Sequence, residues 1–131
     1  MNFIPEIKIL DGKKLIGLKV EMSLLADTTR ELFTTFMPQL SRLGLKSAAD
    51  VYDLRLFPKN FYNSFDAAAM FTKAALIEFD EDITYPPSFQ IMEVPRGMYA
   101  VFTYAGPSEG NEIFAFIFSE WLPKSIYELD N

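Results

Sequence analysis

The chain has 131 residues and a formal net charge of −6, half of its residues are hydrophobic, and it contains neither cysteine nor histidine. The two missing residue types exclude disulfides, the usual zinc sites, and the Ser-His-Asp and Cys-His forms of nucleophilic catalysis. The acidic balance argues against non-specific nucleic-acid binding and favours cationic partners at short range.

This composition predicts a single domain over residues 1–131, with no cofactor and no bound metal. The apolar runs are far shorter than the roughly 20 residues that a membrane-spanning helix needs, and no signal peptide is visible. We therefore expect a soluble, cytoplasmic protein that does not associate with a membrane. Only carboxylates, Lys, Tyr, Ser and Thr remain for acid–base chemistry, which makes an enzyme the less favoured class.

The first segment, "EIKILDGKKLIGLKVEMS", holds two extended apolar runs on either side of Asp11 and Gly12. Asp-Gly between two such runs is a strong signal for a tight turn, so the pattern predicts a hairpin. On the second run, Leu15, Gly17, Lys19 and Glu21 alternate with Ile16, Leu18, Val20 and Met22, which predicts one largely apolar face.

Residues 27–44 predict a helix, because large apolar side chains recur there at helical spacing. Thr28 followed by Glu31 fits a capping box, and Asp27 is an alternative cap. Gly44 is the expected stop. Pro38 lies inside the pattern and should kink the helix without ending it, since the apolar stripe continues beyond it in phase.

Two strands are predicted next, in "ADVYDLRLF" and in "FTKAALIEF", and the acidic "DEDITYPPSF" after them reads as a loop. A strand, a turn and a second strand follow at residues 90–93 and 98–104. A helix capped by Ser108 and closed by Pro123 is expected after them. Gly12 and Gly97 begin the same series of strand, loop and helix, which predicts a βαββ unit followed by an incomplete copy.

The last third of the chain resembles a known family, the GyrI-like effector-binding domain, also called the bacterial transcription activator effector-binding domain. Its Pro-x-Gly-x-Tyr-Ala-Val-Phe strand is matched by residues 95–102, and its loop glycine by Gly106. Its Trp-Leu-Pro-x-Ser-x-Tyr-x-Leu-Asp close is matched by residues 121–130. This segment covers less than a third of the chain, and "FTKAALIEF" and the Pro38 helix are similar more loosely.

The resemblance implies an α+β fold in which duplicated βαββ units form a curved antiparallel sheet with two main helices. Its hydrophobic cleft would bind small molecules, often aromatic or lipophilic cations, and the chain would be a stand-alone member without a DNA-binding domain. Relatives continue past the Leu-Asp segment into a strand that carries a glutamate, and this chain ends before it. The second unit is therefore expected to be incomplete, and its exposed sheet edge suits a homodimer.

Aromatic rings and carboxylates are the candidate ligand-binding residues, and no catalytic or metal-ligating residue is predicted. Phe102 mainly packs, whereas Tyr104 ends in a polar group that suits a ligand-facing position. A tryptophan beside a cleft can stack on a flat cation. Surface charge remains the alternative interpretation for both glutamates. The candidates are Tyr52, Phe57, Glu78, Phe102, Tyr104, Glu120 and Trp121.

The favoured function is a binding module whose aromatic-lined cleft takes a small hydrophobic or cationic ligand. A protein-interaction role, such as modulation of DNA gyrase through the acidic residues 80–82, is the first alternative. A carboxylate-dependent hydrolase is the second.

Overall fold

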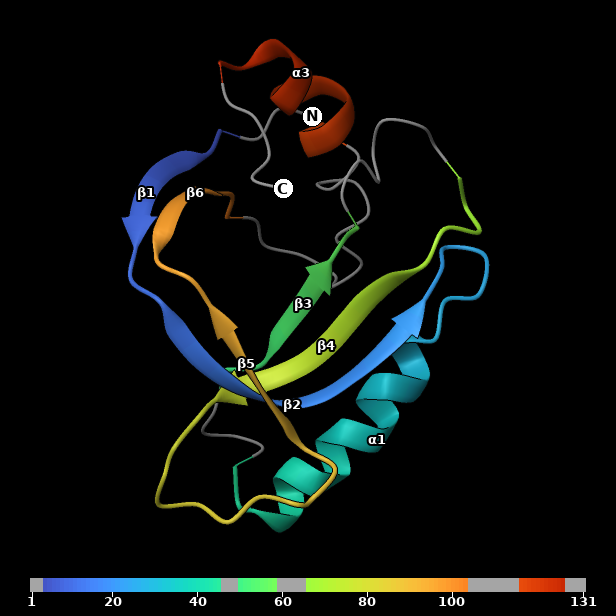
Figure 1. The fold of residues 1–131 in the computed structure, drawn as a ribbon, viewed down its shortest axis with the longest axis vertical. Coiled ribbons are helices and arrows are strands. Elements are labelled where there is room, and N and C mark those ends of the chain that lie inside the picture. The colour runs from blue at the N-terminus through green and yellow to red at the C-terminus, as the bar shows by residue number, and fades with distance from the viewer. Residues whose placement is uncertain (1–3, 46–49, 59–65, 104–115, 127–131) are drawn as a thin grey trace. The chain divides into compact units, whose positions relative to one another are not determined.

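The computed structural model describes residues 4–45, 50–58, 66–103 and 116–126, which fall into two compact units. One unit is Gly12–Pro95, and the other combines the residues up to Asp11 with those from Arg96 onward (Figure 1). The strand pairs among these residues are all antiparallel and helices accompany them, so the predicted α+β class is confirmed.

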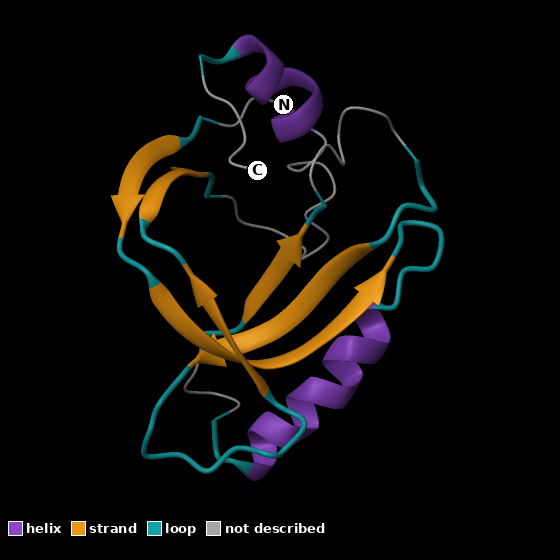
Figure 2. Cartoon of the chain, viewed as in Figure 1, coloured by secondary structure: helices purple, strands orange, loops and turns teal. Residues whose placement is uncertain are grey.

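The larger unit is a four-stranded sheet with one helix. Its elements are β2 (Lys13–Met22), α1 (Thr29–Arg42), β3 (Tyr52–Leu56), β4 (Phe71–Glu78) and β5 (Gln90–Val94). The strand order is β3-β4-β2-β5, and α1 lies on the convex side of the curved sheet (Figures 1 and 2). The order strand, helix, strand, strand predicted for the first half is thus confirmed.

The smaller unit holds a two-stranded ribbon of β1 (Glu6–Leu10) and β6 (Gly97–Val101). It also holds a π-helical turn, η1 (Ile117–Trp121), which continues into the short helix α3 (Leu122–Lys124). The predicted cap Ser108 lies outside the described residues. Pro123 falls inside the last helical turn, and Ser125 has returned to an extended backbone. Among the described residues, no helix is both long and apolar enough to cross a bilayer.

The hairpin predicted around Asp11 and Gly12 is wrong. β1 pairs with β6, with Ile9 opposite Met98, while β2 pairs with β4 and β5. Among the described glycines, Gly44 is the one with a positive φ, so Gly12 does not adopt the conformation that a type I′ turn requires. The strands at 90–94 and 97–101 are both present. They do not pair with each other, because β5 pairs with β2 and β6 pairs with β1.

Both ends of α1 are set by local hydrogen bonds. The Asp27 carboxylate accepts a 2.9 Å hydrogen bond from the backbone N–H of Thr29, while Thr28 makes no side-chain cap, so the predicted capping box is absent. At the other end Gly44 has a φ of 76°. The N–H of Leu45 bonds to the carbonyl of Leu40 at 2.9 Å, which gives the Schellman ending expected of a glycine stop. Pro38 lies inside the helix, as predicted.

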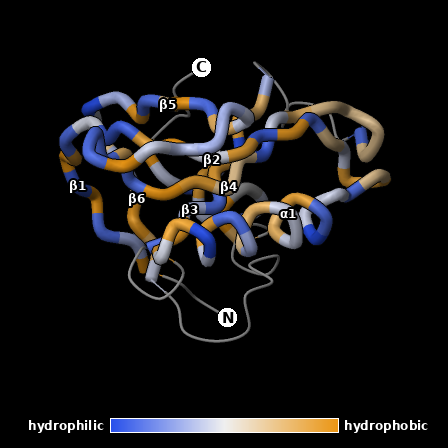
Figure 3. The backbone as a smooth tube through the Cα atoms, turned by 90° about the horizontal axis from the view of Figure 1, so that it is seen from below, coloured by the Kyte–Doolittle hydropathy of each residue, from blue (hydrophilic) through white to orange (hydrophobic). Residues whose placement is uncertain are grey.

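The sheet is apolar on both sides along β2 and β4. On the convex side, Ile16 and Ile77 face each other in register and are buried beneath Phe36 and Leu40 of α1. In Figure 3 hydrophobic and hydrophilic positions alternate along α1, as they should on a helix with one buried face. The opposite, concave face has its own buried group, Leu15, Ala74 and Leu76. The largely apolar face predicted for β2 is the side that packs against α1, and in the first half of the strand the opposite face is buried as well, at Leu15.

Gly17 is required by the close approach of β2 to β4. A Cβ atom at Gly17 would lie 2.0 Å from the carbonyl oxygen of Ala75 and 3.0 Å from the Cα of Leu76. We expect Gly17→Ala to lower the free energy of unfolding by about 1–3 kcal/mol, as overpacking does. Urea unfolding followed by circular dichroism measures this.

The matched control is Gly97→Ala, also in a strand, where the nearest atom to an added Cβ is Tyr99 Cε2 at 3.8 Å. It should change stability by no more than about 0.5 kcal/mol. An equal loss in the two variants would show that the close approach is not the cause.

Candidate functional site

The concave face of the four-stranded sheet has an apolar centre and a polar end. Its buried centre is Leu15, Ala74 and Leu76, and half-buried side chains pack around these three. This outer layer comes from β3 and β5 and consists of Tyr52, Leu54, Met92 and Val94. The face therefore combines a fixed apolar floor with larger side chains that keep part of their surface accessible.

Three polar side chains meet at one end of this face, because the strand register brings them there. Leu15 of β2 lies opposite Glu78 of β4, and Tyr52 of β3 lies opposite Leu76. Lys13 is two residues before Leu15, so it projects from the same face as Leu15. We call Lys13, Tyr52 and Glu78 the Glu78 triad.

The triad is centred on a single carboxylate oxygen. Glu78 Oε1 accepts a 2.9 Å hydrogen bond from Lys13 Nζ and a longer one, 3.4 Å, from the Tyr52 hydroxyl. The hydrogen bond from Lys13 is the largest cause that lowers the pKa of Glu78, followed by the lysine charge, with Tyr52 adding less. The same hydrogen bond raises the pKa of Lys13. The side chains of Lys13 and Glu78 are 45% and 61% exposed, so this ion pair is in water.

The structure thus joins Tyr52 and Glu78, two of the predicted site residues, and separates Phe57 from them. The Phe57 ring packs on Phe71 with ring centroids 5.0 Å apart. Phe71 lies opposite Met22, on the side of the sheet that carries α1. Phe57 and Tyr52 therefore do not share a face, although both belong to the same predicted strand segment.

The remaining predicted residues belong to the smaller unit. Phe102 meets Trp121 edge to face, with ring centroids 5.3 Å apart. Glu120 is exposed beside them, and both Glu120 and Trp121 line a shallow pocket of about 250 Å³ with Phe116, Lys124 and Ser125. Tyr104 lies outside the described residues. Ligand contact by these four residues stays a prediction.

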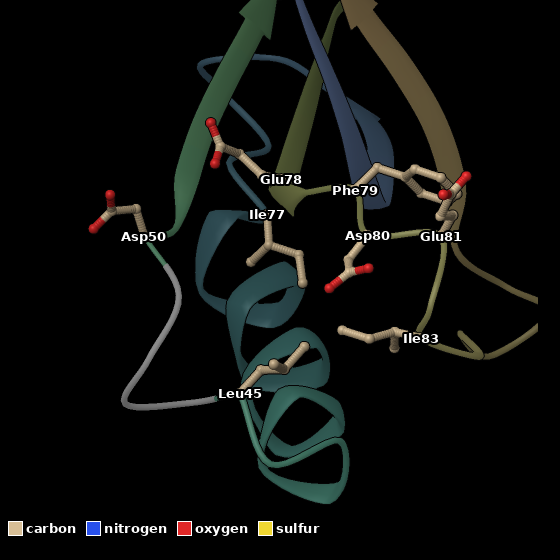
Figure 4. A pocket seen from close by; sticks show the side chains of 8 residues that line it. All are labelled: Leu45, Asp50, Ile77, Glu78, Phe79, Asp80, Glu81 and Ile83. Atoms are coloured by element: carbon tan, nitrogen blue, oxygen red, sulfur yellow. The ribbon is translucent and has the colours of Figure 1, made fainter.

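The larger unit has a hollow of its own, which is apolar at its centre and acidic at its rim (Figure 4). It measures about 540 Å³ and lies between the end of α1, the end of β4 and the loop that follows. Leu45, Ile77 and Ile83 turn toward one another there, and the Asp80 carboxylate points in between them, while the Glu78 carboxylate points away from Ile77. Within the described residues, no group of three or more acidic side chains is placed to hold a metal ion.

An aromatic ladder that the sequence did not reveal runs from the core to this acidic loop. Phe36 contacts Phe89, Phe89 stacks with Tyr85, and Tyr85 stacks with Phe79, with centroids 5.6, 6.0 and 5.7 Å apart. The ammonium of Lys14 lies 4.8 Å from the centroid of the last ring, Phe79. The loop predicted from "DEDITYPPSF" is thus anchored on α1 through its rings.

A buried lysine is another feature that sequence reasoning missed. Lys73 is only 3% exposed, and its ammonium contacts Asp53 Oδ2 at 3.2 Å and donates to Thr29 Oγ1 at 2.9 Å. These contacts tie β4 to β3 and to the start of α1. A lysine inside the largely apolar "FTKAALIEF" was the available signal, because a buried ammonium needs a charged partner.

Comparison with known proteins identifies one family. Residues 6–131 match the family described as integron-associated effector binding protein. This range contains every strand and helix described above and all seven predicted site residues. A search of curated proteins found no match.

The Glu78 triad makes a prediction about titration. In the folded protein the Glu78 carboxyl should titrate below its ordinary pKa of about 4.3, because Lys13 and Tyr52 hydrogen-bond to the charged form. Lys13→Met should raise this pKa toward the ordinary value, and Tyr52→Phe should raise it by less. The linked stabilisation is present above the unfolded-state pKa and is lost as pH falls through the folded-state value.

Carbon-detected NMR of the side-chain carboxyls measures these midpoints. Lys14→Met is the control, because Lys14 contacts the Phe79 ring instead of the carboxylate. An unchanged Glu78 midpoint in Lys13→Met would contradict the assigned hydrogen bond.

Proposed function

We propose that this chain, which belongs to the family of integron-associated effector binding proteins, is a binding module for a small lipophilic cation. The apolar part of the ligand lies on the concave face of the four-stranded sheet, and its positive charge is met by Glu78. Binding requires no reaction at the ligand, in keeping with a sequence that lacks histidine and cysteine.

One observation carries this proposal: a solvated carboxylate stands at the end of an apolar face and already holds a cation. Glu78 Oε1 is bonded to the Lys13 ammonium, and the Tyr52 hydroxyl steadies the same oxygen. A ligand ammonium can take the place of the lysine at this oxygen, and a phosphonium, which has no N–H to donate, can replace its charge. Tyr52 thus holds the carboxylate in position, while the cation bound to the carboxylate can be exchanged for the ligand.

The apolar surface next to Glu78 supplies the rest of the affinity. Leu54 and Met92 are half-buried and rest on the buried Leu15, Ala74 and Leu76. Covering such side chains with a ligand is favourable by about 25 cal/mol for each Å² of apolar surface removed from water. The methionine side chain is unbranched and adapts to ligands of different outline. Tyr52 adds a ring whose face suits a cation.

Calorimetric titration with tetraphenylphosphonium and with neutral triphenylphosphine oxide tests the proposal. We expect saturable binding of tetraphenylphosphonium, and Glu78→Gln should weaken it about fivefold, the effect of one unit charge at about 4 Å in water. The neutral compound should bind both proteins about equally, because it makes no use of the carboxylate.

Glu81→Gln is the matched control, since it removes the same charge from the exposed loop beyond β4. If Glu78→Gln and Glu81→Gln weaken the phosphonium equally, only net charge matters and the assignment of Glu78 is wrong. If the wild-type protein shows no saturable binding of the phosphonium, the proposed function itself is wrong.

A further inference from the structure

We infer that Lys13 competes with the ligand for Glu78. When no ligand is bound, Lys13 pairs with Glu78, and the strength of this pair sets how strongly the site prefers cationic over neutral ligands. This inference rests on the proposed function and concerns the same site. Lys13 is not among the predicted ligand contacts, and the inference makes it a residue that determines specificity.

The geometry shows that Lys13 holds the oxygen a ligand would need. Its ammonium is 2.9 Å from Glu78 Oε1, whereas the Tyr52 hydroxyl is 3.4 Å from the same atom. A cation that enters along the concave face must therefore exchange with the lysine to make its own contact with this oxygen. Tyr52 can stay in place, because a carboxylate oxygen accepts more than one hydrogen bond.

Lys13 can leave without disturbing the sheet. Its backbone is fixed in register opposite Val94 of β5, and the next residue, Lys14, accepts a 2.9 Å hydrogen bond from the N–H of Phe79. Only the side chain has to move, and it is already 45% exposed. A groove of about 580 Å³ lies beside it, lined by Gly12, Lys13, Lys14, Glu93, Val94 and Pro95, and it gives the displaced side chain room in solvent.

The exchange affects cationic and neutral ligands differently. A cation has to replace an existing ion pair, so its gain from Glu78 is reduced by what the lysine loses, and the lysine charge also repels it. A neutral ligand on the apolar face leaves the pair between Lys13 and Glu78 intact. Lys13 therefore narrows the difference in affinity between the two kinds of ligand, and its removal should widen it.

The chain supplies a close control in the adjacent residue. Lys14 projects from the opposite side of β2, and its ammonium lies over the Phe79 ring instead of the Glu78 carboxylate. Lys13→Met and Lys14→Met remove the same charge from neighbouring positions and keep an unbranched side chain. Only the first of them frees Glu78.

The experiment measures the dissociation constants of tetraphenylphosphonium and triphenylphosphine oxide for both variants by calorimetry. Lys13→Met should bind the phosphonium at least about threefold more tightly than Lys14→Met does, a factor typical of a solvated ion pair. The phosphine oxide should bind the two variants equally. In a Glu78→Gln background, the advantage of Lys13→Met over Lys14→Met should shrink to the part that comes from repulsion by the Lys13 charge, because there is no longer a carboxylate to release.

Two results would overturn the inference. Neither would affect the proposed function, which is tested separately by phosphonium binding to the wild-type protein and by its weakening in Glu78→Gln. One is equal phosphonium affinity in Lys13→Met and Lys14→Met. The other is a gain for the neutral compound as large as for the cation, which would show that the added methionine surface acts in place of the freed charge. Lys13→Gln, which adds little apolar surface, repeats the measurement should Lys13→Met fold poorly, and it should again favour only the cation.

Discussion

The pairing of β2 with two strands at once is the constraint on which the larger unit depends. β2 lies between β4 and β5, and the adjacent residues Leu15 and Ile16 are both buried, on opposite faces. The side of Ile16 holds α1, and the side of Leu15 forms the concave face with the candidate site. A strand buries apolar side chains on both faces when it lies in the middle of a sheet. Gly17 allows β4 to approach β2 closely, because it has no Cβ.

The same alternation gives two consecutive lysines two different partners. Lys13 and Lys14 leave β2 on opposite sides, and so do Glu78 and Phe79 at the end of β4. The result is an ion pair on the concave face, between Lys13 and Glu78, and a cation over a ring on the other side, between Lys14 and Phe79. The ring belongs to the ladder that ends at Phe36 in the core, whereas the carboxylate stands at the edge of an apolar surface. The loop is therefore anchored by one pair of neighbouring residues, and the ligand contact that we propose involves the other pair, on the opposite face.

Local pattern was enough to find the elements, and it failed for their partners. The apolar stripe of α1, its glycine stop and the alternation in β3 were readable because each depends on residues a few positions apart. The hairpin at Asp11 and Gly12 was wrong because alternation shows that a segment is extended without showing which strand it pairs with. The site follows the same division. Tyr52 and Glu78 were both predicted as ligand-binding candidates, but the hydrogen bond between them was not predicted. Lys13 was missed because its partner is 65 residues away in sequence and is reached only through the register of β2 and β4.

Exposure decides which lysine of the larger unit can respond to a ligand. Lys73 and Lys13 each form an ion pair across the sheet, at 3.2 and 2.9 Å, so distance alone does not distinguish them. The side chain of Lys73 is 4% exposed, and its ammonium also donates to Thr29, so moving it would leave a charge buried without a partner. Lys13 faces water and loses little when it is displaced, since solvent takes over its charge. The buried lysine therefore fixes β4 to β3 and α1, whereas the exposed one meets the physical requirement for the exchange proposed at Glu78.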